Sequence, residues 1–566
     1  MDNQTDPPST TAESTSSSLG ILFVPGTRRD YPTRVAINRH INQYVRMKRR
    51  KTKEESLEAT QNFQSGGSSR RDSPVESLAV VKKDARRRGH WKQPDPSLGL
   101  YRLGTWHLVS EHLEEPISQK LFHYATKVFW PEFDPGADPA DSPFVANSWV
   151  AHIAEEPLLI HAFLWAASLH LNIRSRTVTR ARGILKHGDL LIQGLTAELS
   201  TPARATRDAV LLAILSLHPQ VDSATVASRF SIEGFSPPLR DLQSIDVYTR
   251  LPFVPSHGAA LVNFIKLRGG LDKLNMPGLG SLMQYTDILS STMHLQPPQF
   301  PLGHLYELAL LGEVVSSNFR QGGHVREEST VGIQSLIHLG LSGSVLQVLF
   351  DMRQLTSLIT RYCDNDKTLD LARLAVHRNS VQHRLLSTIA EFPRSRAQSS
   401  RRLSNQVTAI VQSVLLAFGL GVTFPTAYVE PHETIASQLK LMLTTWRHFP
   451  GLELCRDLIT WACFVGALIS TGTSNEAMVS WFVGELIELE LLHARGAKSQ
   501  PFAALYCRSW ESIKPILEQF VWLGPACDYG SILIWNRVQE ALERKTVLRT
   551  MPFNRDWHSL EGAALY

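Results

Sequence analysis

From about Gly99 onward, apolar residues recur at helical spacing in one segment after another, with short Pro, Gly or charged breaks between them. The clearest segment follows Pro157. Proline suits the first turn of a helix, because its missing N–H needs no partner there, and the carboxylates of Glu155 and Glu156 favour the positive end of the helix dipole. The apolar stripe is wide, which predicts a helix inside a bundle rather than on its surface. Its apolar members are Leu158, Leu159, Ala162, Phe163, Ala166 and Leu169.

The same spacing predicts further helices along this part of the chain. They cover Ser118–Trp130, Arg180–Leu199, Asp208–Leu217, Ser256–Arg268, Thr356–Phe392 (as two helices), Ser404–Leu420, Pro431–Trp446, Leu452–Leu468, Asn475–Ala494 and Trp510–Trp522. Gly269 and Gly270 are a typical helix stop. Two-residue alternation bounded by hairpin turns is not sustained anywhere, so few strands are expected. No fixed repeat indicates a solenoid. We therefore expect an all-α, multi-helix domain over residues 101–566.

Composition fits this interpretation. A chain of 566 residues with 43% hydrophobic and 20% charged residues is typical of a globular protein. The formal net charge of +5 is small, but the basic residues crowd the first hundred positions. Residues 1–20 are rich in Ser, Thr, Asp and Pro, and we expect a disordered tail there, followed by a basic amphipathic helix within 21–56 and a disordered basic linker over 57–100.

The basic helix is expected at Thr33–Lys53, where no acidic residue occurs before Glu54. Like charges three or four residues apart repel, so such a helix favours a polyanionic partner. DNA phosphates, a membrane surface and an acidic import receptor are all alternatives, as is a solvated surface helix. A second basic cluster resembles, with the first, a nuclear localisation signal. The candidate residues are Arg34, Arg39, Arg46, Lys48, Arg49, Arg50, Lys51 and Lys53, then Lys82, Lys83, Arg86, Arg87 and Arg88.

Catalytic and metal-binding signatures are weak throughout. The five cysteines all lie at or after Cys363 without a CxxC pair, which argues against a disulfide framework and a structural zinc site. Gly340–Ser344 only partly matches a nucleophile elbow and lacks the required strand. His161 and His170 have no second ligand at helical spacing. We expect no enzyme, cofactor or metal. The uncharged stretch Val407–Val429 is interpreted as a buried helix rather than a membrane span.

Several segments in order resemble the helical regulatory domain of fungal-specific transcription factors, from about residue 118 to 530. EEPLLIHAFLWAASLHL resembles the opening of that domain, and HGAALVNFIKLRGGLDKL resembles its segment with the pattern H…GL…L…RGG. Tyr285-Thr286-Asp287 before Pro297-Pro298-Gln299-Phe300, and WACFVGALIS, are similar to later parts. The resemblance implies a large all-α regulatory domain that binds partner proteins.

The N-terminus departs from the best-known members of that family, which carry a six-cysteine binuclear zinc cluster that reads DNA. Here FVPGTRRDYPTRVAINRHINQYVRMKRR resembles a subgroup without the cluster. Arg and Lys there would contact phosphates, and Asn38, Asn42 and Gln43 are candidates for adenine edges. The resemblance implies a nuclear transcriptional regulator, with metabolic or secondary-metabolite gene clusters as frequent targets. Its expected partners are double-stranded DNA, co-regulators or transcription machinery, and an import receptor, without a membrane.

Two alternatives to a DNA-binding regulator remain open at this point. One is a scaffold or co-regulator that does not contact DNA and uses the basic clusters only for nuclear import. The other is an enzyme on a helical fold, for which Asp364-Asn365-Asp366 is the local metal-binding candidate, although its position after Tyr362-Cys363 favours a turn between helices. The sequence leaves the target genes, the oligomeric state and any effector ligand open.

Overall fold

The computed structural model describes ten stretches of the chain. These are residues 113–133, 148–176, 182–201, 203–219, 234–303, 331–391, 403–444, 452–473, 475–496 and 509–550. All of them belong to one compact unit, Gly99–Tyr566. Within these stretches the fold is all-α, as predicted, and the β-structure consists of one isolated bridge between Pro219 and Phe253.

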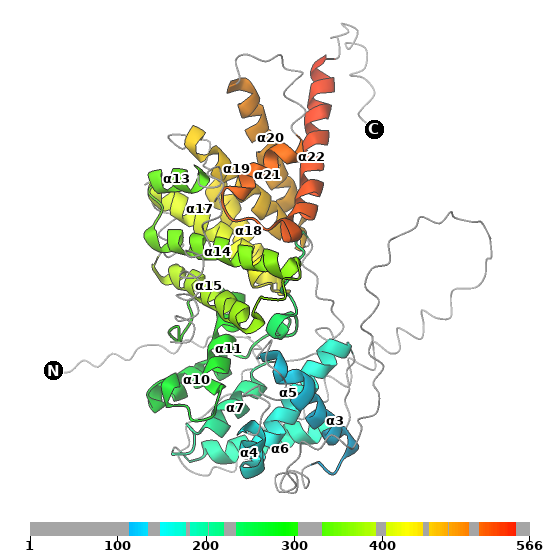
Figure 1. The fold of residues 1–566 in the computed structure, drawn as a ribbon, viewed down its shortest axis with the longest axis vertical. Coiled ribbons are helices and arrows are strands. Elements are labelled where there is room, and N and C mark those ends of the chain that lie inside the picture. Colours follow the sequence, from blue (N-terminus) through cyan, green and yellow to red (C-terminus); the bar gives the residue numbers. More distant parts are fainter. Residues whose placement is uncertain are drawn as a thin grey trace, which may run out of the picture. The chain divides into compact units, whose positions relative to one another are not determined.

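The N-terminal helices surround their own hydrophobic core and are the blue-to-green ribbons of Figure 1. They are α3 (Pro116–Tyr124), a π-helical turn (Ala125–Phe129), α4 (Ser148–Glu155), α5 (Pro157–Ser175), α6 (Arg182–Leu199), α7 (Asp208–Leu217), α9 (Ile245–Tyr248), α10 (Pro255–Arg268) and α11 (Leu279–His294). The central member is α5, which packs against α3, α4, α6 and α7. Most of its wide apolar stripe is buried, with Ala166 and Leu169 half-buried, so the predicted position inside the bundle is confirmed.

Local capping rules explain where several of these helices begin and end. Pro157 lies in the first turn of α5 after Glu156. Gly269 ends α10 in the left-handed region at φ 97°, which a residue without a Cβ adopts at little cost. Gly188 of α6 allows a close approach to α5, because an added Cβ would lie 2.7 Å from the ring of Trp165.

The C-terminal helices surround a second and larger core. They are α13 (Val331–His338), α14 (Gly343–Cys363), α15 (Leu371–Glu391), α17 (Leu403–Phe418), α18 (Val429–Leu443), α19 (Leu452–Thr471), α20 (Glu476–Gly496), α21 (Trp510–Glu518) and α22 (Gly524–Thr550). The helix α11 packs on α7 and also on α15 and α18, so it joins the two groups (Figure 1).

Some predicted boundaries are wrong for identifiable reasons. The helix expected over Ser118–Trp130 leaves α-geometry at Ala125 and continues as a π-turn. The one expected over Trp510–Trp522 ends at Glu518, after Pro515 has removed a backbone donor from its interior. The two helices expected within Thr356–Phe392 are the end of α14 and α15, and Asp364–Asp366 form the turn between them.

The apolar segment Leu403–Thr423 is long and apolar enough to cross a membrane by length and composition alone. Within the bundle, 94% of its apolar window is buried, and α14, α15, α18 and α19 pack around α17. A core helix of a soluble protein passes the same test, so this segment is weak support for a membrane span.

Candidate functional site

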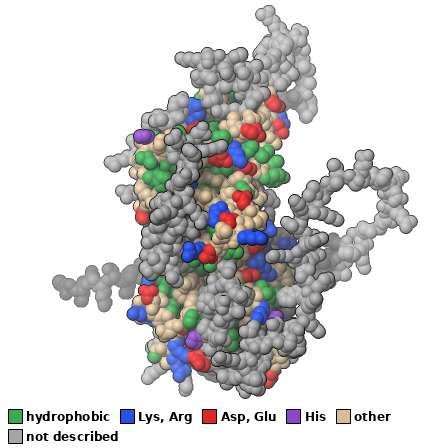
Figure 2. Space-filling model, viewed as in Figure 1, with side chains coloured by type: hydrophobic (Ala, Val, Ile, Leu, Met, Phe, Trp, Pro, Cys, Tyr) green, Lys and Arg blue, Asp and Glu red, His purple; other side chains and the backbone are tan. Residues whose placement is uncertain are grey.

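The thirteen basic residues proposed from the sequence lie outside the described residues. This holds for Arg34, Arg39, Arg46, Lys48, Arg49, Arg50, Lys51, Lys53, Lys82, Lys83, Arg86, Arg87 and Arg88. On the face of the domain in Figure 2, Lys and Arg side chains alternate with Asp and Glu rather than forming one basic patch. The basic N-terminal segment therefore stays a prediction from the sequence.

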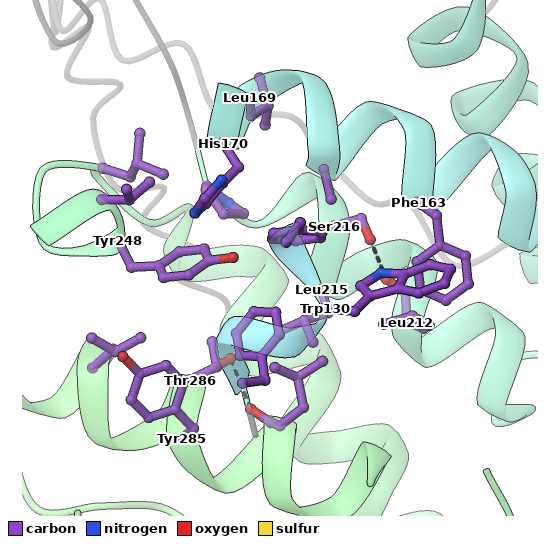
Figure 3. Close-up of a pocket in the computed structure, with 18 of the residues that line it drawn as sticks. Trp130, Phe163, Leu169, His170, Leu212, Leu215, Ser216, Tyr248, Tyr285 and Thr286 are labelled. Atoms are coloured by element: carbon purple, nitrogen blue, oxygen red, sulfur yellow. Dashed lines mark hydrogen bonds between the residues drawn. The ribbon is translucent and has the colours of Figure 1, made fainter. Parts of the chain in front are cut away.

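The described helices enclose an aromatic cavity of about 70 Å³ within the N-terminal core (Figure 3). Trp130 lines it, with its ring centroid 4.7 Å from that of Phe163 and 5.7 Å from that of Trp149, both in edge-to-face contact. Such contacts hold aromatic rings in fixed orientations. The eight aromatic lining residues are Phe129, Trp130, Phe133, Trp149, Phe163, Tyr248, Phe253 and Tyr285.

The π-turn Ala125–Phe129 helps to place two of these rings. A π-turn accommodates one residue more than an α-turn, and such turns are frequent at functional sites. Phe129 ends the turn and Trp130 caps it, with its backbone N–H bonded to the carbonyl of Ala125 at 2.9 Å. Pro131 follows directly and begins a short 3₁₀ turn. The chain thus turns at the point where Trp130 enters the core.

One wall of the cavity carries a buried hydrogen-bond network centred on His170 of α5, which is 2% exposed. Its Nδ1 lies 2.7 Å from the Tyr124 hydroxyl. Its Nε2 lies 2.9 Å from Oγ of Ser244 and 3.3 Å from Oε2 of Glu132. The imidazole is therefore held from both sides by groups on three other segments.

The pKa shifts in this network assign its protons. Burial raises the pKa of Tyr124 far above neutrality, so its hydroxyl keeps its proton and donates to His170. Burial also lowers the pKa of His170, which makes the imidazole neutral at pH 7. Burial alone would raise the pKa of Glu132, but the bond from His170 and the charge of Arg174 outweigh it and lower the pKa. Nε2–H consequently donates to an ionised Glu132 carboxylate and to Ser244.

Arg174 extends the network toward the surface. Its guanidinium bonds Oδ2 of Asp246 at 3.0 Å and Oε2 of Glu132 at 3.2 Å, and it lies 3.8 Å from Oδ1 of Asp241. Burial raises the pKa of Asp246 to about 6 despite this cation, because its Oδ1 is buried without a hydrogen-bond partner among the described residues. Arg174 thus lies among three carboxyl groups, and Arg250 also acts on Asp246 while Arg240 lies 3.8 Å from Asp241.

The Trp130 indole is 0% exposed, and its Nε1–H has no hydrogen-bond partner among the described residues. The cavity therefore offers apolar ring faces and a polar wall whose protons are already engaged. These are properties of a binding site more than of a reacting centre, because His170 is hydrogen-bonded at both nitrogens.

Other candidates from the sequence have structural partners. Glu156 pairs with Arg207. His161 bonds His187, with 3.0 Å between their Nδ1 atoms, and His187 Nε2 lies 2.7 Å from Ser118 Oγ, so His161 is a buried core histidine. The partially matching segment Gly340–Ser344 begins α14.

No group of three or more His, Cys, Asp or Glu side chains in the described stretches is placed to hold a metal ion. In the Asp364–Asp366 turn, Asp366 accepts hydrogen bonds from the backbone and hydroxyl of Thr368 and from Arg361. Cys455, Cys463 and Cys527 are buried free thiols, and Cys363 is half-buried.

Sequence reasoning missed most of the His170 network. Tyr124 lies 46 positions before His170 and Ser244 lies 74 positions after it. No local spacing connects residues so far apart, and only the histidine itself attracted notice. Comparison of the chain with protein-family models, curated proteins and solved structures finds no match. The resemblance to the fungal regulatory domain therefore stays a prediction.

Proposed function

We propose that this protein is a nuclear transcriptional regulator of the fungal type, with a basic N-terminal segment that contacts DNA and a helical regulatory domain. The observation that carries the proposal is Thr33–Lys53, which contains eight Lys and Arg residues and no acid. Such a charge density favours phosphate contacts, which supply affinity and orientation on DNA. The mixed charge of the domain face in Figure 2 supports assigning DNA contact to this segment.

The helical domain fits the regulatory part of the proposal. It contains an aromatic cavity, and α11 connects the half that encloses the cavity with the larger C-terminal half. A ligand-dependent change in one half has a direct route to the other through these contacts. Activation or repression of a metabolic gene cluster is the role that the resemblance favours.

The test is the binding of full-length protein to genomic DNA fragments at several salt concentrations. A deletion of residues 28–53 is compared with a matched variant in which Lys82, Lys83, Arg86, Arg87 and Arg88 are all changed to Gln. We expect the deletion to abolish binding and the matched variant to retain most of it. If all eight basic residues contact phosphates, log K should fall against log salt with a slope of about −7.

Nuclear import is tested separately with fluorescent fusions of the same variants in a fungal cell. Loss of nuclear accumulation in both variants, together with absent DNA binding by the full-length chain, would overturn the DNA-binding role. That outcome would favour the co-regulator, which reaches DNA only through a partner.

A further inference from the structure

Most polar hydrogens in the lining of the aromatic cavity already have an acceptor within the fold. Both ring nitrogens of His170 are hydrogen-bonded. Other lining side chains each donate to a backbone carbonyl oxygen, so they have no hydrogen left for a ligand. They are Ser216 (to Leu212, 2.8 Å), Thr286 (to Leu282, 2.9 Å), Trp149 (to Pro277, 2.7 Å) and Tyr285 (to Gln243, 2.9 Å).

The hydroxyl of Tyr248 differs from these groups. Tyr248 ends α9 and is half-buried, although both of its chain neighbours are buried. Its hydroxyl has no hydrogen-bond partner among the described residues, and unlike the unpartnered Nε1 of Trp130 it keeps accessible surface. In Figure 3 it points into the space between His170, Ser216 and Trp130. A ligand in the cavity can therefore reach this hydroxyl.

The charge state of the lining restricts the ligand. Burial raises the pKa of Tyr248 well above its ordinary value, so the phenol keeps its proton at pH 7 and is a hydrogen-bond donor. No Lys, Arg, Asp or Glu among the described residues lines the cavity. A charged ligand group would lose its hydration there without gaining a partner of opposite charge. The cavity therefore favours an uncharged ligand with an oxygen acceptor.

The volume of the cavity limits the size of the ligand. Its volume of about 70 Å³ is roughly half of the ~150 Å³ of an apolar protein cavity that holds benzene. The space thus fits a molecule of about three to five heavy atoms. The aromatic side chains around it favour an apolar body, because its removal from water is favourable.

We propose that the aromatic cavity binds a small uncharged carbonyl compound, a short-chain ketone or aldehyde. Its oxygen accepts a hydrogen bond from the Tyr248 hydroxyl, and its alkyl groups lie among the aromatic rings. The binding claim stands on the cavity alone. The role of such a compound as an effector rests on the regulatory function proposed above.

Tyr248 also connects such a ligand with the C-terminal core. The helix α9 begins directly after Gln243 and Ser244, and Ser244 is bonded to His170 in the cavity wall. On its other side, Gln243 accepts a hydrogen bond of 2.8 Å from Arg378 of α15. A displacement of Tyr248 by a ligand would therefore be transmitted through α9 to a helix of the other core.

The experiment is a titration of full-length protein with butanone, followed by saturation-transfer NMR of the ligand in sealed tubes. The comparison ligand is the alkene in which a CH₂ group replaces the carbonyl oxygen, so the two molecules have nearly the same shape. We expect both to bind. Tyr248→Phe should weaken butanone about tenfold and leave the alkene unchanged, because only the ketone loses a hydrogen bond. Comparing each ligand between the two proteins cancels the different hydration of ketone and alkene.

Three further variants control for effects on the cavity as a whole. Ala166 lines the cavity, so the larger side chain of Ala166→Leu should fill it and abolish binding of both ligands. Ala197→Leu, at an exposed position of α6, should bind both like the unaltered protein. Tyr285→Phe removes a lining hydroxyl that is already bonded to Gln243, so the ratio of ketone to alkene affinity should stay unchanged. Thermal unfolding of each variant verifies that it is folded.

Unchanged butanone affinity in Tyr248→Phe, equal weakening of ketone and alkene in that variant, undiminished binding in Ala166→Leu, or no saturation transfer at millimolar butanone would overturn the proposal. These outcomes are independent of the DNA experiment. Salt-sensitive DNA binding without butanone binding removes only the cavity ligand. Butanone binding without DNA binding removes only the proposed regulatory function.

Discussion

The guanidinium of Arg378 on α15 donates a hydrogen bond of 2.8 Å to the side-chain oxygen of Gln243, and the amide of Asn379 donates to the same oxygen at 2.9 Å. Gln243 and Ser244 have φ values of 54° and 53°, a left-handed conformation that costs a residue with a side chain about 1–3 kcal/mol. On the other side, His170 bonds Ser244. Contacts from both cores therefore fix this turn beside the aromatic cavity.

Replacement of Arg378 tests how much its hydrogen bonds to the Leu242–Gln243 turn contribute to the stability of the fold. The side chain is 0% exposed and also donates to the carbonyl of Leu242 at 3.0 Å. Arg378→Met removes these donors and leaves buried acceptors unsatisfied, each at a cost of about 1–3 kcal/mol. We expect the free energy of unfolding in urea to fall by about 2–5 kcal/mol. The control is Arg373→Met one turn earlier, where the side chain is exposed, which should change it by less than about 0.5 kcal/mol.

Local rules explain what the sequence predicts well. Pro157 and Gly269 each affect the backbone within one helical turn, so their positions are visible in a short window. The long helix α22 is not predicted, because its apolar residues surround the helix: Trp535 and Val538 are buried, whereas Tyr529 is exposed. A helix of this kind has no apolar stripe to detect.

The cavity and its network depend on contacts between distant residues. The pairing of Arg378 with Gln243 spans 135 positions, and Trp130 reaches its ring partners only because Ala125–Phe129 adopts a π-turn. Neither the Arg378–Gln243 pairing nor the π-turn can be recognised from the spacing of residues in a short stretch of sequence. The function proposed from the basic segment comes from charge density, which the sequence shows directly and the fold does not alter.

Close packing between α19 and α20 gives a second prediction. A Cβ on Gly466 would overlap the ring of Phe482, which is 0% exposed, so Gly466→Ala should lower the free energy of unfolding by about 1–3 kcal/mol. Gly484 in α20 is the matched control, because an added Cβ has no other atom within 4 Å. Gly484→Ala should raise stability by about 0.5–1 kcal/mol through helix propensity. Equal effects of the two changes in urea denaturation would contradict close packing at Gly466.

Buried histidines should make the fold sensitive to acid. His432 is 4% exposed, and burial lowers its pKa to about 4, whereas an unfolded chain has a histidine pKa of about 6.5. Between these values the unfolded state binds more protons, so the contribution of His432 is complete above pH 6.5 and is lost as the pH falls through 4. Its full size is about 3 kcal/mol.

The variant His432→Gln isolates this contribution from those of the other titrating groups. Its free energy of unfolding, measured by urea denaturation at pH 7 and at pH 4.5, should fall less between the two values than that of the unaltered protein. The absolute stability of the variant is immaterial, because only the difference between the two pH values is compared. An identical difference in both proteins would show that His432 does not titrate on unfolding.

The hydrogen bond between Tyr124 and His170 gives the last prediction. Tyr124→Phe keeps the buried ring but removes the donor to His170 Nδ1, so the free energy of unfolding should fall by about 1–3 kcal/mol. Tyr529→Phe, at a side chain that is 74% exposed, is the control and should have little effect.

His170→Phe should lower the free energy of unfolding more than Tyr124→Phe does, since it leaves Tyr124, Ser244 and Glu132 without their shared partner. If the two residues act as a pair, the double variant Tyr124→Phe/His170→Phe loses less stability than the sum of the single variants, because it removes both the Tyr124 donor and the His170 acceptor and leaves neither of them unpaired. Additive losses would mean that the network holds the cavity wall through packing alone.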